Sequence, residues 1–316
     1  MRRISIDPLI VLILSAVVLA IVFPVRGQAA EWFRYATDIA IAALFFLYGA
    51  RLSTREALEG LKHWRLHLTI LAFTFVLFPL IGIALQPLGS WFGAGIAMGL
   101  MYLTLVPSTV QSSVAFTSIA KGNVAGAIVS ASLSNMLGVF LTPILVMALM
   151  THDGSVHVDT SVFIKIATQL LLPFVLGQLL RPIVGAVAAT KGTKVVDRGS
   201  ITMVVYSAFS QGMVAGIWAS IGAMQIIALI VLSAAIVALM LWLSKLVAQK
   251  LHFGRGDRIA IQFCGSKKSL ASGLPMAAVI FGGAQLSLLI LPLMIFHQVQ
   301  LIMCSWYAQH LHSQKR

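Results

Sequence analysis

The chain has 316 residues, of which 59% are hydrophobic and only 10% are charged, and its mean hydropathy is +0.97. Soluble domains carry roughly 25% charged residues, so this composition excludes a water-soluble fold. The net charge of +13 does not call for nucleic acid as a partner, because basic residues accumulate in the cytoplasmic loops of membrane proteins. The two cysteines, Cys264 and Cys304, lie in apolar segments and predict neither a disulfide framework nor a metal cluster.

Apolar runs long enough to cross a bilayer recur from end to end. We predict ten transmembrane helices, at about 8–24, 34–50, 66–86, 91–119, 124–150, 161–181, 199–219, 224–247, 259–282 and 286–307. The first run follows a basic start but lacks a small-residue cleavage site, so we interpret it as a helix and not as a signal peptide. The chain is therefore predicted to be an all-α polytopic membrane protein, folded as one membrane-embedded unit over 1–316.

Basic residues predict the orientation of these ten spans. Of the 22 lysines and arginines, seventeen fall on the side that carries both termini, two (Arg26 and Arg34) fall on the other side, and three lie within spans. Because cytoplasmic loops are enriched in lysine and arginine, both termini are predicted to be cytoplasmic. The short loops and the absence of a targeting sequence favour a bacterial inner membrane.

The two halves of the chain resemble each other. Pro24 ends the first span in FPVRG, and Pro182 ends the sixth in RPIVG, 158 positions later. Ser112 in the fourth span and Lys268 in the ninth are 156 positions apart. Since each half holds five spans, the second half would be inverted in the bilayer, with repeat one at about 1–155 and repeat two at about 156–316. Inverted repeats of this kind are a transporter architecture whose site lies near the midplane.

Spans four and nine are predicted to be broken. Span four would be 29 residues and ~43 Å long, which exceeds a hydrocarbon core of ~30 Å. Its middle reads LVPSTVQSSVAF (105–116), a proline followed by polar residues, and span nine reads CGSKKSLASGLP (264–275) at the matching place, with Pro275 at its end. Small polar residues and prolines also serve ordinary helix packing in membranes. Breaks at corresponding positions of both halves favour a transport site instead.

Five stretches of the sequence resemble one known family: LFFLYGARLS (44–53), FPLIG (78–82), LVPSTVQSSVAF (105–116), AKGNVAGA (120–127) and FCGSKKSLASGLPM (263–276). They resemble the bile acid:sodium symporter superfamily, and in particular its divergent symporter-like branch that includes solute carrier family ten, member seven. The resemblance covers essentially the whole chain. It implies a panel domain of spans 1, 2, 6 and 7 and a core domain of the other six spans, in which the broken helices 4 and 9 cross.

The sequence departs from the sodium-coupled members of that superfamily at the ion ligands. Those members have Ser-Asn after the span-four break, where this chain has Ser112 and Ser113. They have Glu-x-Gly-x-Gln-Asn in span nine, where Phe263 stands at the glutamate and Lys267 and Lys268 stand at Gln-Asn. The acidic ligand is replaced and two ammonium groups are added, so we do not expect a sodium site of the family type.

Other ligand positions that the resemblance implies are altered as well. Two hydroxyl ligands on span five fall at Ala127 and Ala131, with Ser130 and Ser134 close by, and a glutamine on span three falls near Thr74. The candidate substrate- and ion-binding residues lie at the two breaks and on spans three and five. They are Thr74, Pro107, Ser108, Thr109, Gln111, Ser112, Ser113, Ser130, Ser134, Gln262, Gly265, Ser266, Lys267, Lys268 and Ser269.

The adjacent lysines are the most unusual feature of span nine. A lysine at the centre of a membrane helix costs about 2.5–3.5 kcal/mol, and these two lie ~13 Å from the cytoplasmic end of the span. Beside a purely structural role, in which carbonyl groups satisfy the lysines without significance for transport, three functional hypotheses follow. One lysine stands in permanently for the coupling ion at the negative ends of half-helices; or one binds and releases a proton and couples transport to the proton gradient; or the pair binds an anionic substrate together with half-helix N-termini.

Together these patterns predict a secondary transporter of an organic anion that works by alternating access. The alternative is a membrane regulator of ion homeostasis that keeps the carrier fold without moving solute. The sequence has no HExxH pair and no paired aspartates, so we do not predict an enzyme, and we predict no cofactor or bound metal. The predicted partners are a small organic anion and the lipid bilayer, with no nucleic acid and with the oligomeric state left open.

Overall fold

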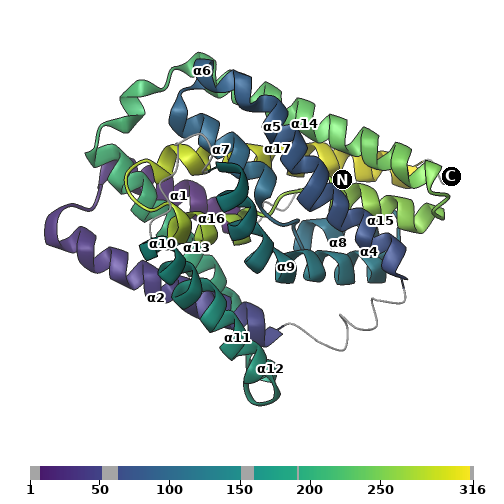
Figure 1. Cartoon of the computed structure of the whole chain (residues 1–316), viewed down its shortest axis with the longest axis horizontal. Coiled ribbons are helices and arrows are strands. Elements are labelled where there is room, and N and C mark those ends of the chain that lie inside the picture. Colours follow the sequence, from purple (N-terminus) through teal and green to yellow (C-terminus); the bar gives the residue numbers. More distant parts are fainter. Residues whose placement is uncertain (1–7, 52–62, 151–159, 191, 314–316) are drawn as a thin grey trace. The chain divides into compact units, whose positions relative to one another are not determined.

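The computed structural model describes residues 8–51, 63–150, 160–190 and 192–313. Every regular element in these residues is a helix (Figure 1). Each predicted span overlaps a helix, a run of consecutive helices or a pair separated by a break. The second helix begins earlier than predicted, since α2 covers Gly27–Arg51 and so includes Glu31 and Trp32.

Five of the described helices are long and apolar enough to cross a membrane: Gly27–Arg51, Trp64–Phe92, Val124–Met150, Ala223–Lys250 and Leu286–Ser313. A sixth candidate is the pair Ile166–Leu179 and Arg181–Ala188, which bends by 102° between its two parts. Pro182 lies in the first turn after this bend, where its missing N–H is tolerated. The other predicted spans are a 15-residue helix, α1 (Pro8–Val22), a helix with charged residues in its first turns, α13 (Thr193–Val214), and the two broken segments.

The chain divides into two compact units that are interleaved in sequence. The first unit comprises Met1–Leu52, Val158–Ile221 and Leu274–Leu288, and the second comprises Ser53–His157, Gly222–Gly273 and Leu289–Arg316. The first unit thus holds α1, α2, α13, α10 (Thr160–Lys165), the π-helical turn η4 (Ile166–Leu171), α11 (Leu172–Leu179), α12 (Arg181–Ala188) and the short helix η5 (Ile217–Ser220).

In the first unit, α2 packs against α11 and α13, and α1 packs against α13. The contact between α2 and α11 is close because both helices present a glycine to the other. An added Cβ at Gly49 would meet the carbonyl oxygen of Phe174, and one at Gly177 would meet the carbonyl oxygen of Phe46. Small residues that allow backbones to approach are the usual means of joining helices in membranes.

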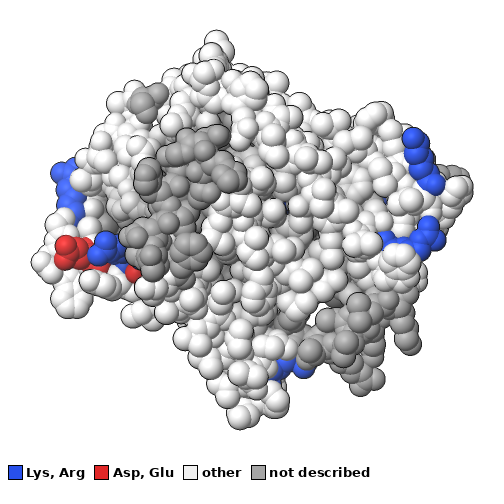
Figure 2. Space-filling model, in the orientation of Figure 1, with Lys and Arg blue, Asp and Glu red and all other residues white. Residues whose placement is uncertain are grey.

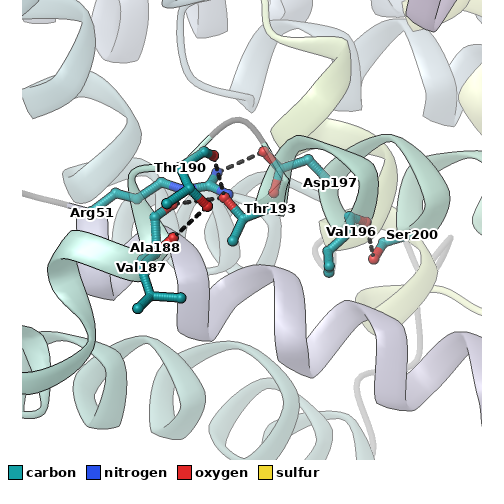
Figure 3. A network of polar contacts seen from close by, with 8 residues as sticks. All are labelled: Arg51, Val187, Ala188, Thr190, Thr193, Val196, Asp197 and Ser200. Atoms are coloured by element: carbon teal, nitrogen blue, oxygen red, sulfur yellow. Dashed lines mark hydrogen bonds and ion pairs between the residues drawn. The ribbon is translucent and has the colours of Figure 1, made fainter.

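Arg51, the last residue of α2, joins three helices of this unit (Figure 3). Its Nε donates to the carbonyl oxygen of Ala188 at the end of α12 (2.7 Å), and its Nη1 forms an ion pair with Asp197 Oδ2 on α13 (2.6 Å). The hydroxyl of Thr193 donates to the same Ala188 oxygen at 2.7 Å. A cation at the last carbonyls of α12 also complements the negative end of that helix.

Arg51→Met is expected to lower the free energy of unfolding by about 1–2 kcal/mol, because it removes two charge-assisted hydrogen bonds from a partly exposed site. Thermal unfolding of the detergent-purified protein, followed by circular dichroism, measures the change. Arg51→Lys is the control: it keeps the charge but lacks the planar fork, so it should restore only part of the loss. Full stability of Arg51→Met would contradict a structural role for this network.

The second unit holds α4 (Trp64–Ala72), η2 (Phe73–Leu77), α5 (Phe78–Leu85), η3 (Gln86–Leu88), α6 (Gly89–Phe92), α7 (Ala94–Leu105), α8 (Gln111–Ile119), α9 (Val124–Met150), α14 (Ala223–Lys250), α15 (Arg255–Gly265) and most of α17 (Leu286–Ser313). Within it, α15 packs against α4, α8, α9 and α14. Asn123 caps α9, because its Oδ1 accepts from the N–H of Gly126, and its Nδ2 donates to Asp257 at the start of α15. The start of α9 is therefore hydrogen-bonded to the start of α15.

The surface of the described helices is largely apolar. Large side chains such as Ile39 (71% exposed), Val231 (63%) and Ile302 (72%) point outward without covering by the protein. On the face drawn in Figure 2, most lysine, arginine and acidic side chains lie at the margins, and the white area between them is largely without charge. A surface of this kind is suited to lipid, as expected of an integral membrane protein.

Candidate functional site

The first break separates α7 from α8, as predicted from its proline. Val106 is extended (φ −76°, ψ 157°), which is the conformation favoured before a proline, and Pro107 has no N–H to continue the helix. The last carbonyl groups of α7 therefore lack the N–H partners that a continuous helix would supply. Residues 106–110 form the break.

The second break separates α15 from α16 (Leu270–Ile280). Pro275 lies inside α16, so its expected part in this break is wrong. The break is made instead by backbone groups that bond outside their own helix. Gln300 of α17 accepts from the N–H of Lys268 (2.9 Å) and donates to its carbonyl oxygen (2.8 Å). The next N–H, that of Ser269, donates to Pro107 O at 2.7 Å.

Hydrogen bonds join the two breaks directly. Besides the Ser269–Pro107 bond, the hydroxyl of Ser108 donates to Cys264 O at 2.6 Å. The hydroxyl of Ser113 donates to Phe263 O at 3.1 Å. The C-terminal carbonyls of α15 are thus capped by serines of the other break. We call residues 104–113 together with 263–269 the crossing; all of them belong to the second unit.

Lys268 is fully buried at the crossing, and all three of its ammonium hydrogens are used. Its Nζ donates to the carbonyl oxygens of Thr104, Val106 and Thr74, each at 2.8 Å. Two of these carbonyls end α7, where the helix dipole places partial negative charge. The ring of Phe78, 4.2 Å from Nζ, covers the ammonium on another side. Lys268 therefore joins the broken end of α7 to η2 through one cation.

The third carbonyl is available because of a π-helical turn next to a proline. The N–H of Phe78 bonds the carbonyl of Phe73, five residues back. The residue after it, Pro79, has no N–H. Neither of the two positions that would normally bond the carbonyl of Thr74 can do so, and the ammonium of Lys268 takes their place. Single π-helical turns are often found at functional sites.

Three further backbone groups at the first break bond to side chains of α9. Thr142 donates to Leu105 O at 2.9 Å, and Asn135 donates to Ser108 O at 2.8 Å. The N–H of Ser108 donates to the hydroxyl of Ser134 at 3.1 Å. These side chains supply partners that a continuous helix would otherwise provide.

Lys267 has a different environment from its neighbour. Its Nζ is also fully buried, yet no hydrogen-bond acceptor reaches it among the residues that the structure describes. It lies 3.9 Å from the centroid of the Phe116 ring and 5.4 Å from that of Phe263. The aromatic faces supply cation–π attraction only. Residues 267–269 lie outside the helices, and the two adjacent lysine side chains have different surroundings.

Several of the other predicted site residues also lie at the crossing. The hydroxyl of Thr109 bonds those of Ser112 and Ser113, both at 2.8 Å. An added Cβ at Gly265 would lie 3.1 Å from the Cβ of Phe73. The hydroxyl of Ser269 donates to that of Ser272 at 3.2 Å.

Three predicted residues make their bonds elsewhere or face outward. Ser130 pairs with His67 Nδ1 at 2.6 Å. The amide of Gln262 bonds Arg258 O and accepts from the hydroxyl of Tyr307. Gln111 is exposed at the start of α8. These three therefore do not contribute to the hydrogen bonds that join the breaks.

Two residues that hold the crossing were not among the predicted site residues. Asn135 bonds Ser108 O and accepts from Ser272 at 2.6 Å, and Gln300 bonds both backbone groups of Lys268. Asn135 is one of only two asparagines in the chain and lies within an apolar span, which is a usable signal. Gln300 follows His297 by one turn and bonds its Nδ1 at 2.8 Å, so it belongs to a visible polar pair.

Two broken helices that meet through their breaks, within an all-helical and largely apolar protein, define a membrane transporter. The comparison with protein families agrees. The SBF-like CPA transporter family matches residues 7–313, and the chain belongs to this family. The resemblance to the bile acid:sodium symporter superfamily is thus confirmed.

Individual relatives extend along most of the chain. The Pseudomonas aeruginosa protein PA2026, named as uncharacterized, is 46% identical over 300 residues, covering 94% of this chain and 90% of its own. The putative symporter YfeH of Escherichia coli is 43% identical over 310 residues, covering 96% and 92%. Sodium/bile acid cotransporter 7 of Rattus norvegicus is 31% identical over 273 residues, covering 84% and 80%.

Proposed function

We propose that this protein is a secondary transporter of an organic anion that works by alternating access in a bacterial inner membrane. Ten transmembrane helices in two inverted repeats, with both termini cytoplasmic, complete the proposal. The names of two relatives, a putative symporter and a sodium/bile acid cotransporter, support transport of a solute. The division into one unit with α1, α2 and α10–α13 and another with α4–α9, α14 and α15 supports a panel and a core.

The proposed mechanism gives Lys268 the place of the coupling ion. The observation that carries it is the set of three carbonyl oxygens, each 2.8 Å from one ammonium. A cation held by carbonyls at the C-terminal end of a broken helix is how transporters bind sodium. Here the cation is a side chain of the protein itself. The one carboxylate in the described part of this unit, Asp257, accepts from Asn123 and is not a ligand at the crossing. Transport is therefore proposed not to depend on sodium at this site.

The melting temperature of the wild-type protein is expected to stay constant as sodium replaces choline at fixed ionic strength. Lys268→Ala removes the ammonium and leaves three carbonyls around a space, so this variant should be less stable and should gain a saturable stabilisation by sodium. Lys267→Ala is the control and should gain none. Saturable stabilisation of the wild type by sodium would contradict the proposed role of Lys268.

Transport itself is tested without knowing the solute. Proteoliposomes preloaded with a mixture of organic acids are exposed to the same mixture in isotopically labelled form, and mass spectrometry identifies the acids that exchange. Exchange of at least one organic anion, with and without sodium, is the expected result. If no solute exchanges, the regulator of ion homeostasis on a carrier fold becomes the better reading.

A further inference from the structure

The ammonium of Lys267 is an energetic anomaly within the second unit. A buried charge without a hydrogen-bonded partner costs several kcal/mol, of order 3–5 where a partner has been removed. The ring of Phe116, 3.9 Å away, returns only about 2 kcal/mol even when desolvated. No hydrogen-bond acceptor compensates for the rest among the described residues. The position calls for a partner of opposite charge.

That partner does not come from the described part of the unit itself. Its single carboxylate, Asp257, is bonded to Asn123. The electrostatic neighbours of Lys267 are the thiols of Cys264 and Cys304. The hydroxyl of Ser266, also buried, has no oxygen or nitrogen partner among the described residues and lies by the Cys304 thiol. The Lys267 ammonium thus remains without a hydrogen-bond acceptor among the described residues.

One side of this group is close to the surface. Phe116 lies on α8, whose residues Ala115 and Ser118 are exposed, and its own ring is half-buried. The other ring, that of Phe263, is fully buried, and its centroid lies 5.9 Å from that of Phe116 and 6.0 Å from that of Tyr307, with both ring pairs tilted. Movement of the Phe116 side chain would therefore open Lys267 from the side of α8, while Phe263 stays as its floor.

We propose that Lys267 binds the charged group of the transported anion and that the ring of Phe116 covers this group between binding events. This inference rests on the proposed function and assigns different tasks to the two lysines. Lys268 has no hydrogen left to donate, whereas Lys267 has three. Of the two lysines, only Lys267 has a charge available to the solute, and its surroundings are aromatic.

The chemistry of the site selects the class of solute. A single ammonium neutralises a carboxylate or a sulfonate, while a dianion would leave a charge uncompensated in an apolar setting. The rings of Phe116 and Phe263 offer apolar contact for the body that carries the charge. The structure thus points to an organic monoanion with an apolar body.

The test uses benzoate as a monoanionic probe and benzamide as its neutral counterpart. Thermal unfolding of the purified full chain is titrated with each, sodium chloride keeping the ionic strength constant. Benzoate should raise the melting temperature saturably and benzamide should not. Lys267→Gln should weaken the apparent affinity for benzoate about tenfold or more, which corresponds to 1.4 kcal/mol. Lys267→Arg should retain it, because the charge remains.

Two results would overturn the inference. Benzoate could stabilise Lys267→Gln as strongly as wild type, which would place anion binding elsewhere, or it could fail to stabilise wild type at all. Failure of the proposed function looks different: benzoate would bind in a Lys267-dependent way while the proteoliposomes exchange no organic anion. Phe116→Leu removes the cation–π contact but not the charge, and should leave benzoate binding dependent on Lys267.

Discussion

Lys268→Met is expected to destabilise the protein and Lys267→Met is not, although the residues are adjacent and both are fully buried. Lys268→Met should lower the free energy of unfolding by about 4 kcal/mol, because it leaves three buried carbonyls without a donor. Lys267→Met should leave stability unchanged or raise it, because it replaces an unpaired buried charge with a thioether over aromatic rings.

The two variants control for each other, since they introduce the same side chain one position apart. Unfolding of the detergent-purified proteins, measured side by side by circular dichroism, gives the comparison. Organic-anion exchange separates the roles further: loss of Lys268 should abolish exchange together with stability, and loss of Lys267 should abolish exchange in a protein that remains folded. Equal destabilisation by both substitutions would show that Lys267 has a bonded partner and would remove the basis for its role in binding.

Gly177→Ala is expected to destabilise the first unit by about 2–3 kcal/mol, an effect at the upper end of overpacking. The new Cβ would meet the carbonyl oxygen of Phe46 and approach the backbone nitrogen of Ala50 to 2.9 Å. Backbone cannot move aside as a flexible side chain can, so α2 and α11 would have to separate along their whole contact. The reciprocal glycine, Gly49, faces Phe174 in the same way.

Gly199→Ala is the matched control, because Gly199 lies within α13 of the same unit and its added Cβ would meet nothing within 4 Å. Alanine is the better helix former, so this variant should be as stable as wild type or more stable by up to about 1 kcal/mol. Thermal unfolding of both variants and of wild type measures the two changes in stability. If Gly177→Ala behaved like Gly199→Ala, the close approach of α2 to α11 would not be needed for stability.

The helices and the first break could be predicted because their causes are local. Apolar runs predict the helices. Pro107 and the extended residue before it end α7 for local steric reasons. The second break was placed in the correct segment, since the polar run around Lys267 and Lys268 is visible in the sequence. Its cause was not predictable, because the N–H of Lys268 goes to Gln300 and that of Ser269 goes to Pro107, both far away in the chain.

The partners of Lys268 show why the chemistry of the site could not be predicted from the sequence. Its three acceptors are main-chain oxygens, and a carbonyl has no residue-specific signature. Thr74 was a predicted site residue for a side-chain role, yet it contributes its carbonyl while its hydroxyl bonds Ile70 O. The difference between the lysines was equally hidden, since it depends on which side chain meets Phe116 and which meets Thr104.

The three-carbonyl contact of Lys268 has a thermodynamic consequence. A bound ion stabilises a protein by an amount that depends on its free concentration and its dissociation constant. The ammonium of Lys268 is covalently attached, so the site it fills has no free ligand and its occupancy does not vary with salt composition. An ion gradient does work only through a site that is loaded on one side and emptied on the other. The stabilisation that Lys268 gives to the crossing is therefore independent of the ion concentrations on either side of the membrane.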